Sequence, residues 1–312
     1  MNDDMPESEA VRLFTVPITP ELAQEAADAL AFFRDLAENA LPAADGAPFD
    51  ESATSVFLRE RAQIEALAEP LRGERRKLYS MLIQIATLTK DNAIDHVRAL
   101  EHDILMDPPP VWSPLTLSRV VMEGVLFSEY LLDPSISLAK RFARVAGVWM
   151  TDALHSEKQA LALGADQPGA SAMKAYVEDC LRKCQASERR NVRDKLIGYS
   201  VDGEDAPMDL NITERAARAM PSWLPAPYRL TSGAAHNRPW MLDRARIVAG
   251  GAGLAGEAAT VMAASMVAIG AVETVVRIFG EFFGLDMSSV LDQMKTAQQG
   301  FLYRAIAIAH GQ

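Results

Sequence analysis

The residues best suited to chemistry lie together within residues 225–242. Arg229, Ser232 and His236 stand there at positions i, i+3 and i+7, which share one face if the segment is helical. Arginine keeps its proton and can clamp an anion, whereas histidine gains and loses a proton near neutral pH. The spacing therefore predicts a site that holds a phosphate-like anion and moves a proton beside it.

Each residue of this face has a predicted role. We expect Arg229 to bind the anion and His236 to act as acid or base, while Ser232 orients the substrate or is attacked. Tyr228 and Asn237 lie at the edges of the face and are predicted to contact the substrate. The expected partner is an anionic small molecule or RNA.

A buried acid is expected to support this face. Glu129, which belongs to an earlier segment, is predicted to orient Arg229 or His236, on helix-packing grounds only. A structural interpretation competes with the catalytic one. In it, Arg229 pairs with a buried acid such as Glu129 or Asp133, and His236 caps a neighbouring helix, as in the polar networks of large helical bundles.

The pair Arg229 and His236 fits the R-x(4–6)-H pattern and so resembles the HEPN superfamily of compact helical bundles. The segment YRLTSGAAH is also similar to a YR-x-x-S-x-x-x-H segment of uncharacterised actinobacterial helical proteins. In many HEPN proteins these residues form a metal-independent RNase site that a dimer partner completes. The resemblance, which covers at most the chain from about Leu71 onward, implies that Arg229 stabilises the scissile phosphate and His236 transfers a proton. Leu230 departs from the pattern, because catalytic members often carry a polar residue there.

A second constellation leaves another class of function open. Asp91 and Asp95 share a helical face and resemble the Asp-rich magnesium motif of class I terpene synthases, which are also all-α. The second motif of that family is incomplete, because Asp286 and Ser289 are followed by Gln293 where a glutamate is expected. The alternatives are thus a lyase or cyclase whose apolar helical pocket holds an anionic group, and a non-catalytic interaction or regulatory protein.

Metal and cofactor motifs are missing from the sequence. No two histidines lie four residues apart, no Glu-x-x-His occurs, and the glycines at 250–253 lack the lysine of a phosphate-binding loop. We therefore expect no metal and no cofactor. Cys180 and Cys184 are spaced poorly for a disulfide, and the polar, acidic N-terminus does not read as a signal peptide, so a cytoplasmic location is expected.

The composition suits a large helical core. Of the 312 residues 49% are hydrophobic but only 7% aromatic, and the net charge of −11 disfavours non-specific nucleic-acid binding. Two basic clusters run against that charge, and they are interpreted either as solvated helix faces or as a local anion or RNA track. The clusters are Arg72, Arg75, Arg76 and Lys77, and Arg182, Lys183, Arg189, Arg190, Arg193 and Lys195.

Apolar periodicity and cap residues predict an all-α fold, a multi-helix bundle with a Pro-rich connection and a long Gly/Ala-rich central helix. We expect a disordered tail at 1–18, an N-terminal helical hairpin at 19–69 and the main bundle at 70–312. A loop or small hairpin is expected at 198–211. Helices are expected near 19–39, 55–68, 71–106, 113–132, 135–163, 171–187, 189–197, 213–220, 228–237, 242–284 and 287–309.

One apolar stretch has the length of a membrane span. Between Arg246 and Glu273 the only charged residue is Glu257, and glycine and alanine dominate. A charge in mid-span would cost about 2.5 kcal/mol or more, so a central helix wrapped by others is the favoured interpretation. We expect no membrane partner, and a homodimer formed through the small-residue helices.

Overall fold

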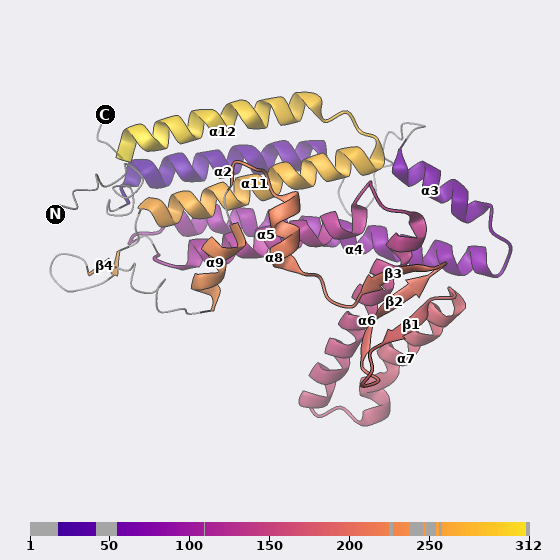
Figure 1. The fold of residues 1–312 in the computed structure, drawn as a ribbon. Coiled ribbons are helices and arrows are strands. Elements are labelled where there is room, and N and C mark those ends of the chain that lie inside the picture. Colours follow the sequence, from indigo (N-terminus) through magenta and orange to yellow (C-terminus); the bar gives the residue numbers. More distant parts are fainter. Residues whose placement is uncertain are drawn as a thin grey trace, which may run out of the picture.

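The computed structural model describes residues 18–41, 55–108, 110–224, 227–236, 246–247, 254–255 and 258–309. These residues form mainly helices, with a three-stranded sheet and a two-stranded ribbon, so the predicted all-α class is confirmed (Figure 1). Residues 1–17 of the predicted tail lie outside the described part of the chain.

Long helices form the body of the molecule. Helix α11 lies between α2 and α12 on one side and α5 on the other, and α4 packs along α5 (Figure 1). The helices of the body, with α3 at one end of α4, are α2 Pro20–Ala40, α3 Val56–Glu65, α4 Leu71–Ile104, α5 Ser113–Leu132, α11 Ala258–Phe283 and α12 Ser288–Ala309. Buried side chains of α2 and α3 belong to the same hydrophobic core as the rest, so residue 69 marks no break in the packing.

Side-chain caps explain where several helices begin. The side-chain oxygens of Thr19, Ser55, Ser137 and Asp166 each accept a hydrogen bond from the backbone N–H three residues later, at 2.9–3.2 Å. Each cap satisfies one of the free N–H groups at a helix start. The starts predicted at Thr19 and Ser55 are confirmed, whereas α6 begins at Leu138 and not at residue 135, and α7 begins at Gln167 and not at residue 171.

Helix α11 is the predicted central helix. It is the one described helix that is long and apolar enough to cross a membrane, and it is mostly buried within the fold, as in the core of a soluble protein. Its alanines and glycines let α2, α5 and α12 approach closely. The predicted start at residue 242 is wrong, because residues 246–247 and 254–255 form an extended pair, β4 Arg246–Ile247 and β5 Leu254–Ala255.

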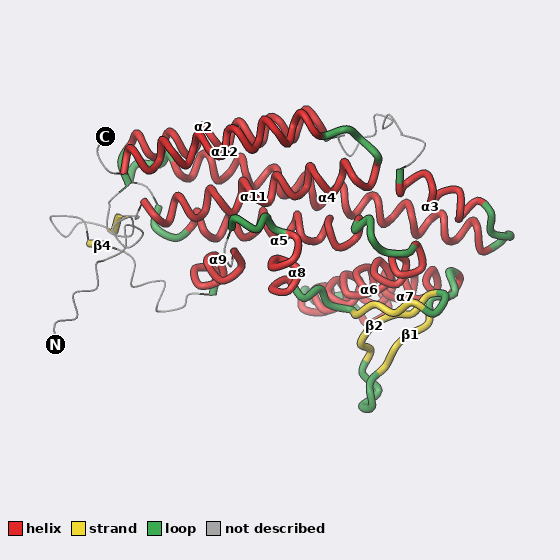
Figure 2. Tube along the Cα trace, turned by 45° about the horizontal axis from the view of Figure 1, so that its top comes forward, coloured by secondary structure: helices red, strands yellow, loops and turns green. Residues whose placement is uncertain are grey.

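A smaller unit, residues 138–207, projects from the body, and we call it the arm (Figures 1 and 2). It consists of helices α6 and α7 and an antiparallel sheet in the order β1-β2-β3, which lies on α6. Its elements are α6 Leu138–Ala162, α7 Gln167–Lys183, β1 Ser187–Arg190, β2 Leu196–Val201 and β3 Glu204–Pro207.

The arm corrects one prediction. Residues 189–197, predicted as a charged helix, form most of the β1–β2 hairpin. The Oδ1 atom of Asn191 accepts hydrogen bonds from the backbone N–H groups of Arg193 and Lys195, which closes the turn. Asp202 and Gly203 both have positive φ, as the tight turn from β2 to β3 requires, so the hairpin expected within 198–211 is confirmed.

Two short helices connect the arm to α11. Helix α8, Ile212–Ala219, and helix α9, Pro227–Ala235, both pack on α5. Pro221 follows α8 and Pro227 begins α9, as the predicted Pro-rich connection requires. The connection thereby brings α9 to the side of α5, although the two are about 100 residues apart in the chain.

Candidate functional site

Helix α9 carries the predicted face. Its residues Pro227, Thr231 and Ala234 are buried, and they follow the i, i+4, i+7 spacing of one helix side. Because α9 packs on α5, the other side of α9 faces outward. Arg229 and His236 are exposed on that side.

The backbone keeps helical geometry through the end of the motif. The N–H of His236 donates to the carbonyl oxygen of Ser232 at 3.1 Å, which is the i to i−4 bond of an α-helix. Arg229, the half-buried Ser232 and His236 therefore share one face, as predicted. The rise from Arg229 to His236 is about 10 Å, a span that the long arginine side chain can shorten toward a common ligand.

Tyr228, at the edge of this face, is fixed by α5. Its hydroxyl accepts a hydrogen bond from Nη2 of Arg119 at 3.3 Å, and the guanidinium carbon of Arg119 lies 5.0 Å from the centre of the Tyr228 ring. Nε of Arg119 donates to Glu123 at 2.7 Å. Nη1 of Arg119 is buried and has no hydrogen-bond partner within the described residues. Asn237 lies outside these residues.

The sequence did not indicate that Arg119 belongs to the candidate site. Arg119 and Glu123 stand at i and i+4, the spacing of an ordinary surface ion pair, and nothing in that spacing points to Tyr228. A second arginine thus lies at the edge of the α9 face. Glu123 pairs with its charge, and Arg119 acts at this edge through its contacts with Tyr228.

Glu129 has a different partner from the one predicted. It is buried in α5, and both of its carboxylate oxygens accept hydrogen bonds from Arg215 of α8, one of them at 2.8 Å. Glu129 therefore fixes α8 on α5, and within the described residues it makes no hydrogen bond to Arg229 or His236.

Asp133, at the end of α5, is the second acid considered for Arg229. It accepts hydrogen bonds from the Ser135 hydroxyl at 2.5 Å, from Arg215 at 3.0 Å and from Arg218 at 2.8 Å. Burial opposes the charge of Asp133, but these hydrogen bonds and nearby Arg144 outweigh it and hold the pKa of Asp133 well below its usual range. Neither Glu129 nor Asp133 pairs with Arg229 in the described structure. The structural interpretation of Arg229 therefore has neither of the two partners it suggested.

Arginines on two helices enclose the ring of Tyr130, next to Glu129. The guanidinium carbons of Arg144 and Arg215 lie 4.4 Å and 5.5 Å from its centre. Burial raises the pKa of the Tyr130 hydroxyl, which has no hydrogen-bond partner within the described residues. The network joins α5, α6 and α8 around Tyr130 and serves as packing between these helices.

Comparisons of the chain with known proteins gave no match. No protein-family model matches it, and no similar protein was found among curated sequences or solved structures. The resemblance to the HEPN superfamily therefore depends on the α9 motif and on helical architecture.

The acidic residues of the terpene-synthase alternative have other partners here. Asp91 pairs with the buried Lys90, and Asp95 pairs with Arg98 at 3.2 Å. Asp286 accepts a hydrogen bond from the backbone N–H of Ser288 and so caps α12. Across the described ranges, no group of three or more His, Cys, Asp or Glu side chains is arranged to hold a metal ion.

Proposed function

We propose that the chain is a HEPN-like, metal-independent phosphodiesterase that acts on RNA, with its site on the outer face of α9. One observation carries the proposal: the helical bond from His236 to Ser232 keeps Arg229, Ser232 and His236 on one face, and the arginine and histidine are exposed. A cation and a titratable imidazole are thereby available to the same ligand.

The proposed chemistry is transfer of a phosphodiester to a hydroxyl of its own ribose. The 2′-hydroxyl attacks the neighbouring phosphorus and loses its proton to water, while the bond from phosphorus to the 5′-oxygen of the next nucleotide breaks, which leaves a 2′,3′-cyclic phosphate. Arg229 binds the non-bridging oxygens, whose negative charge increases during attack. His236, as imidazolium, donates a proton to the leaving 5′-oxygen, and Ser232 donates a hydrogen bond to the phosphate.

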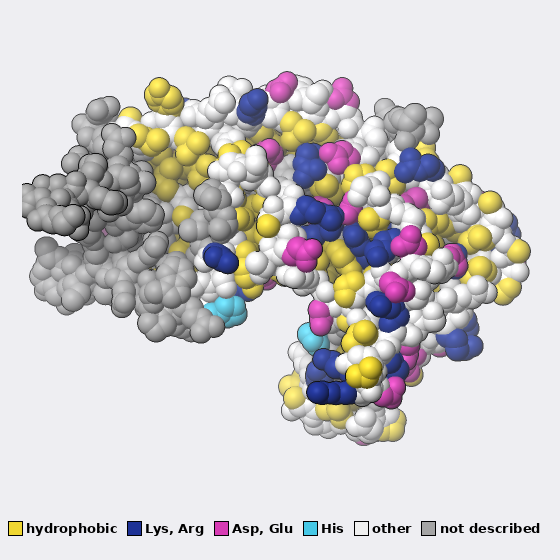
Figure 3. Space-filling view, in the orientation of Figure 1, with side chains coloured by type: hydrophobic (Ala, Val, Ile, Leu, Met, Phe, Trp, Pro, Cys, Tyr) yellow, Lys and Arg dark blue, Asp and Glu magenta, His cyan; other side chains and the backbone are white. Residues whose placement is uncertain are grey.

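The arm offers a basic surface for the RNA strand. Figure 3 shows Lys and Arg side chains gathered toward the free end of the arm, and a hollow between the arm and the rest of this face. Arg189 and Arg190 form ion pairs within the arm, whereas Arg193 and Lys195 form none within the described residues. The second basic cluster of the sequence thus offers positive charge, despite the net charge of −11.

The test compares wild type with His236→Ala on labelled RNA in EDTA. Positioned acid–base groups contribute about 10²–10⁴ in rate, so the variant should lose at least about 100-fold. His102→Ala, which changes an exposed histidine of α4 outside the arm, is the matched control and should cleave like wild type. Wild type that leaves RNA intact, or a His236→Ala variant as active as wild type, would refute the proposal.

The homodimer, which the sequence led us to expect through the small-residue helices, stays a prediction. The small residues of α11 pack within the chain, so the second copy would need another surface. Sedimentation of the chain measures its oligomeric state, and mixing His236→Ala with Arg229→Ala subunits tests whether two copies share one site. Activity regained on mixing is expected if each copy contributes a different residue.

A further inference from the structure

A pocket in the arm lies between α7 and the β1–β2 hairpin. Its volume of about 570 Å³ is within the range of small-molecule sites. On the helix side, Ala175, Glu178 and Arg182 line it at i, i+3 and i+7, which is one face of α7. None of the residues that line the pocket belongs to the predicted catalytic face.

Tyr199 of β2 forms part of the inner wall of the pocket. It is only 2% exposed, yet it lines the pocket. Its hydroxyl has no hydrogen-bond partner within the described residues. A buried hydroxyl that lacks a partner is unfavourable, and a polar ligand in the pocket would provide the missing hydrogen bond.

Two carboxylates lie near the Tyr199 hydroxyl. Glu188 of β1 stands directly opposite Tyr199 in the antiparallel ladder, so the two side chains are neighbours on the same face of the sheet. Glu178 reaches the pocket from α7. Burial and then the negative charges of Glu188 and Glu178 raise the pKa of the Tyr199 hydroxyl, which agrees with this closeness.

The acidic side chains of the pocket differ in how fully they are paired. Asp179 pairs with Arg182, the arginine of the lining. Glu188 pairs with Arg190 through Oε2 alone, at 2.7 Å, so its other oxygen stays available. Glu178 forms no ion pair within the part of the chain that the structure describes. The pocket therefore offers a free carboxylate, one further carboxylate oxygen and the tyrosine hydroxyl.

We propose that this pocket binds a primary ammonium group on an aliphatic stem, as in a free alkylamine or a lysine side chain. An ammonium group has three N–H donors, which match the three available acceptors, and the unpaired charge of Glu178 favours a cation. Ala175, Leu181 and Ala186 provide apolar surface for the stem. An organic cation fits better than a metal ion, because no group of three or more His, Cys, Asp or Glu side chains in the described ranges is arranged to hold one.

NMR titration of the isotope-labelled chain tests the head group with three ligands that have the same stem: pentylamine, pentanol and pentyltrimethylammonium. Pentylamine should bind at least about tenfold more tightly than the other two, because pentanol lacks the charge and pentyltrimethylammonium lacks the N–H donors. The amide signals that move should belong to residues 175–188 and 198–200. Nα-acetyl-lysine methylamide presents the same head from a peptide, and its affinity relative to pentylamine distinguishes the two sources of the ammonium.

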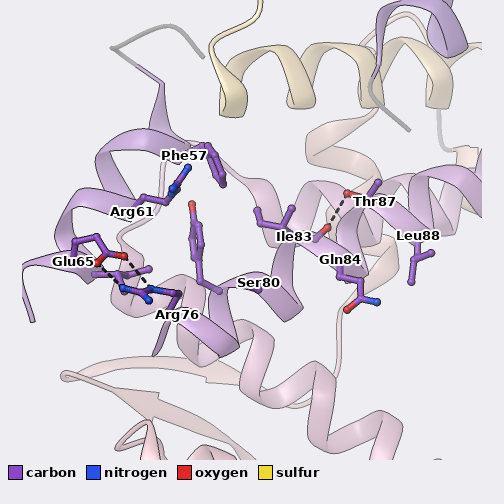
Figure 4. Close-up of a pocket in the computed structure, with 11 residues that line it drawn as sticks. Phe57, Arg61, Glu65, Arg76, Ser80, Ile83, Gln84, Thr87 and Leu88 are labelled. Carbon is purple, nitrogen blue, oxygen red and sulfur yellow. Dashed lines mark hydrogen bonds and ion pairs between the residues drawn. The ribbon is translucent and has the colours of Figure 1, made fainter. Parts of the chain in front are cut away.

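Two variants each remove one acceptor. Glu178→Gln and Tyr199→Phe should weaken pentylamine binding about tenfold. Because the Tyr199 hydroxyl bonds no described residue, Tyr199→Phe should unfold in urea at no lower concentration than wild type, so lost binding is not lost folding. Tyr303→Phe, which changes an exposed tyrosine of α12, is one control. Glu65→Gln is the other, in a separate pocket between α3 and α4 where Arg76 pairs with Glu65 (Figure 4). Both controls should bind like wild type.

Three results would overturn the proposal. Pentylamine binds no better than the comparison ligands, or it binds Glu178→Gln and Tyr199→Phe as it binds wild type. In the third, Glu65→Gln weakens binding as much as Glu178→Gln does, which would assign the binding to the net charge of −11 and not to this pocket. His236→Ala should bind pentylamine like wild type, which keeps this result separate from the RNase test.

Discussion

Arg141 is the residue whose replacement tests most sharply how the body and the arm are joined. It lies in α6 and is fully buried. Its Nε is 3.0 Å from both carboxylate oxygens of Glu60 in α3, and its Nη atoms donate to the carbonyl oxygens of Leu131 and Asp133 at the end of α5. Its guanidinium also lies 4.9 Å from the ring centre of Phe282 in α11. One side chain of α6 thus bonds to two other segments, α3 and the end of α5, and packs on a third, α11.

Arg141→Met keeps the apolar stem and removes the charge. Within the described residues, Glu60 is then left buried with the hydrogen bond from Tyr79 alone, and the carbonyl oxygens of Leu131 and Asp133 lose the donors that Arg141 provides. Removing one partner of a buried pair costs about 3–5 kcal/mol, a large share of the 5–15 kcal/mol by which folded domains are stable. Arg98→Met breaks a half-exposed pair with Glu38 and should cost about 1 kcal/mol or less.

The assay is urea unfolding followed by circular dichroism at about pH 5 and pH 8. Burial already raises the pKa of Glu60, and without Arg141 that pKa rises further. When a carboxyl group has a higher pKa in the folded state than in the unfolded state, its contribution to stability is fully present below the unfolded-state pKa. That contribution is lost as the pH rises through the folded-state pKa. The deficit of Arg141→Met should therefore be larger at pH 8 than at pH 5.

A double variant isolates the pair. Glu60→Gln with Arg141→Met should lose less than the sum of the two single losses, because no unpaired charge remains. The reasoning is refuted if Arg141→Met costs no more than Arg98→Met, or if its deficit grows as the pH falls.

Two further predictions concern the arm. Burial raises the pKa of the Cys184 thiol to about 11, so iodoacetamide at about pH 8 should modify the partly exposed Cys180 first; equal rates by mass spectrometry would contradict this. A Cβ at Gly147 would lie 2.7 Å from the Pro207 carbonyl, so Gly147→Ala should cost about 1–3 kcal/mol in urea unfolding by pushing β3 off α6. Gly300→Ala, which meets only the mobile end of Arg304, should be neutral or stabilising, and equal effects of the two would count against the clash.

The long helices could be predicted because their signals are local. A capping side chain at Thr19 or Ser55 and a stop such as Gly284, which has a positive φ, each act within one helical turn. Apolar periodicity then identifies the buried side. The start of α11 was missed because residues 247–256 carry no charge and are rich in glycine and alanine, and composition alone did not separate them from the apolar helix that follows.

The arm's sheet was harder to predict because its strands lack the alternation of apolar and polar residues that is typical of a strand. Strand β1 has the sequence Ser-Glu-Arg-Arg and is mostly exposed. Because it is so rich in charged residues, its sequence resembles that of an exposed helix. A usable signal was present at Asp202 and Gly203, since Asp-Gly between short strands favours the tight hairpin turn. Pairing the two strands at that turn would have placed β2 and β3.

The residues that share the face of the candidate site could be predicted from their spacing in the sequence. The contacts of the helices packed around that face could not. Arg229, Ser232 and His236 lie within eight residues, so helical geometry alone aligns them. Glu129 binds Arg215, which is 86 residues away in the chain, and no spacing rule gives that pair. Long-range pairs depend on how whole helices pack, which the sequence does not state locally.

Arginine placement separates the structural residues from the candidate functional one. The buried arginines each reach a carboxylate: Arg75 bonds Asp202 through both Nη atoms, at 2.6 and 2.7 Å, and others bind Glu60 or Glu129. Burying a guanidinium without such a partner would be costly, so these pairs are requirements of the fold. Arg229 is exposed, shares its helix face with a histidine, and has no carboxylate partner within the described residues. Arg229 lies on the outer face of α9 and does not belong to these buried pairs, which agrees with the anionic ligand proposed for that face.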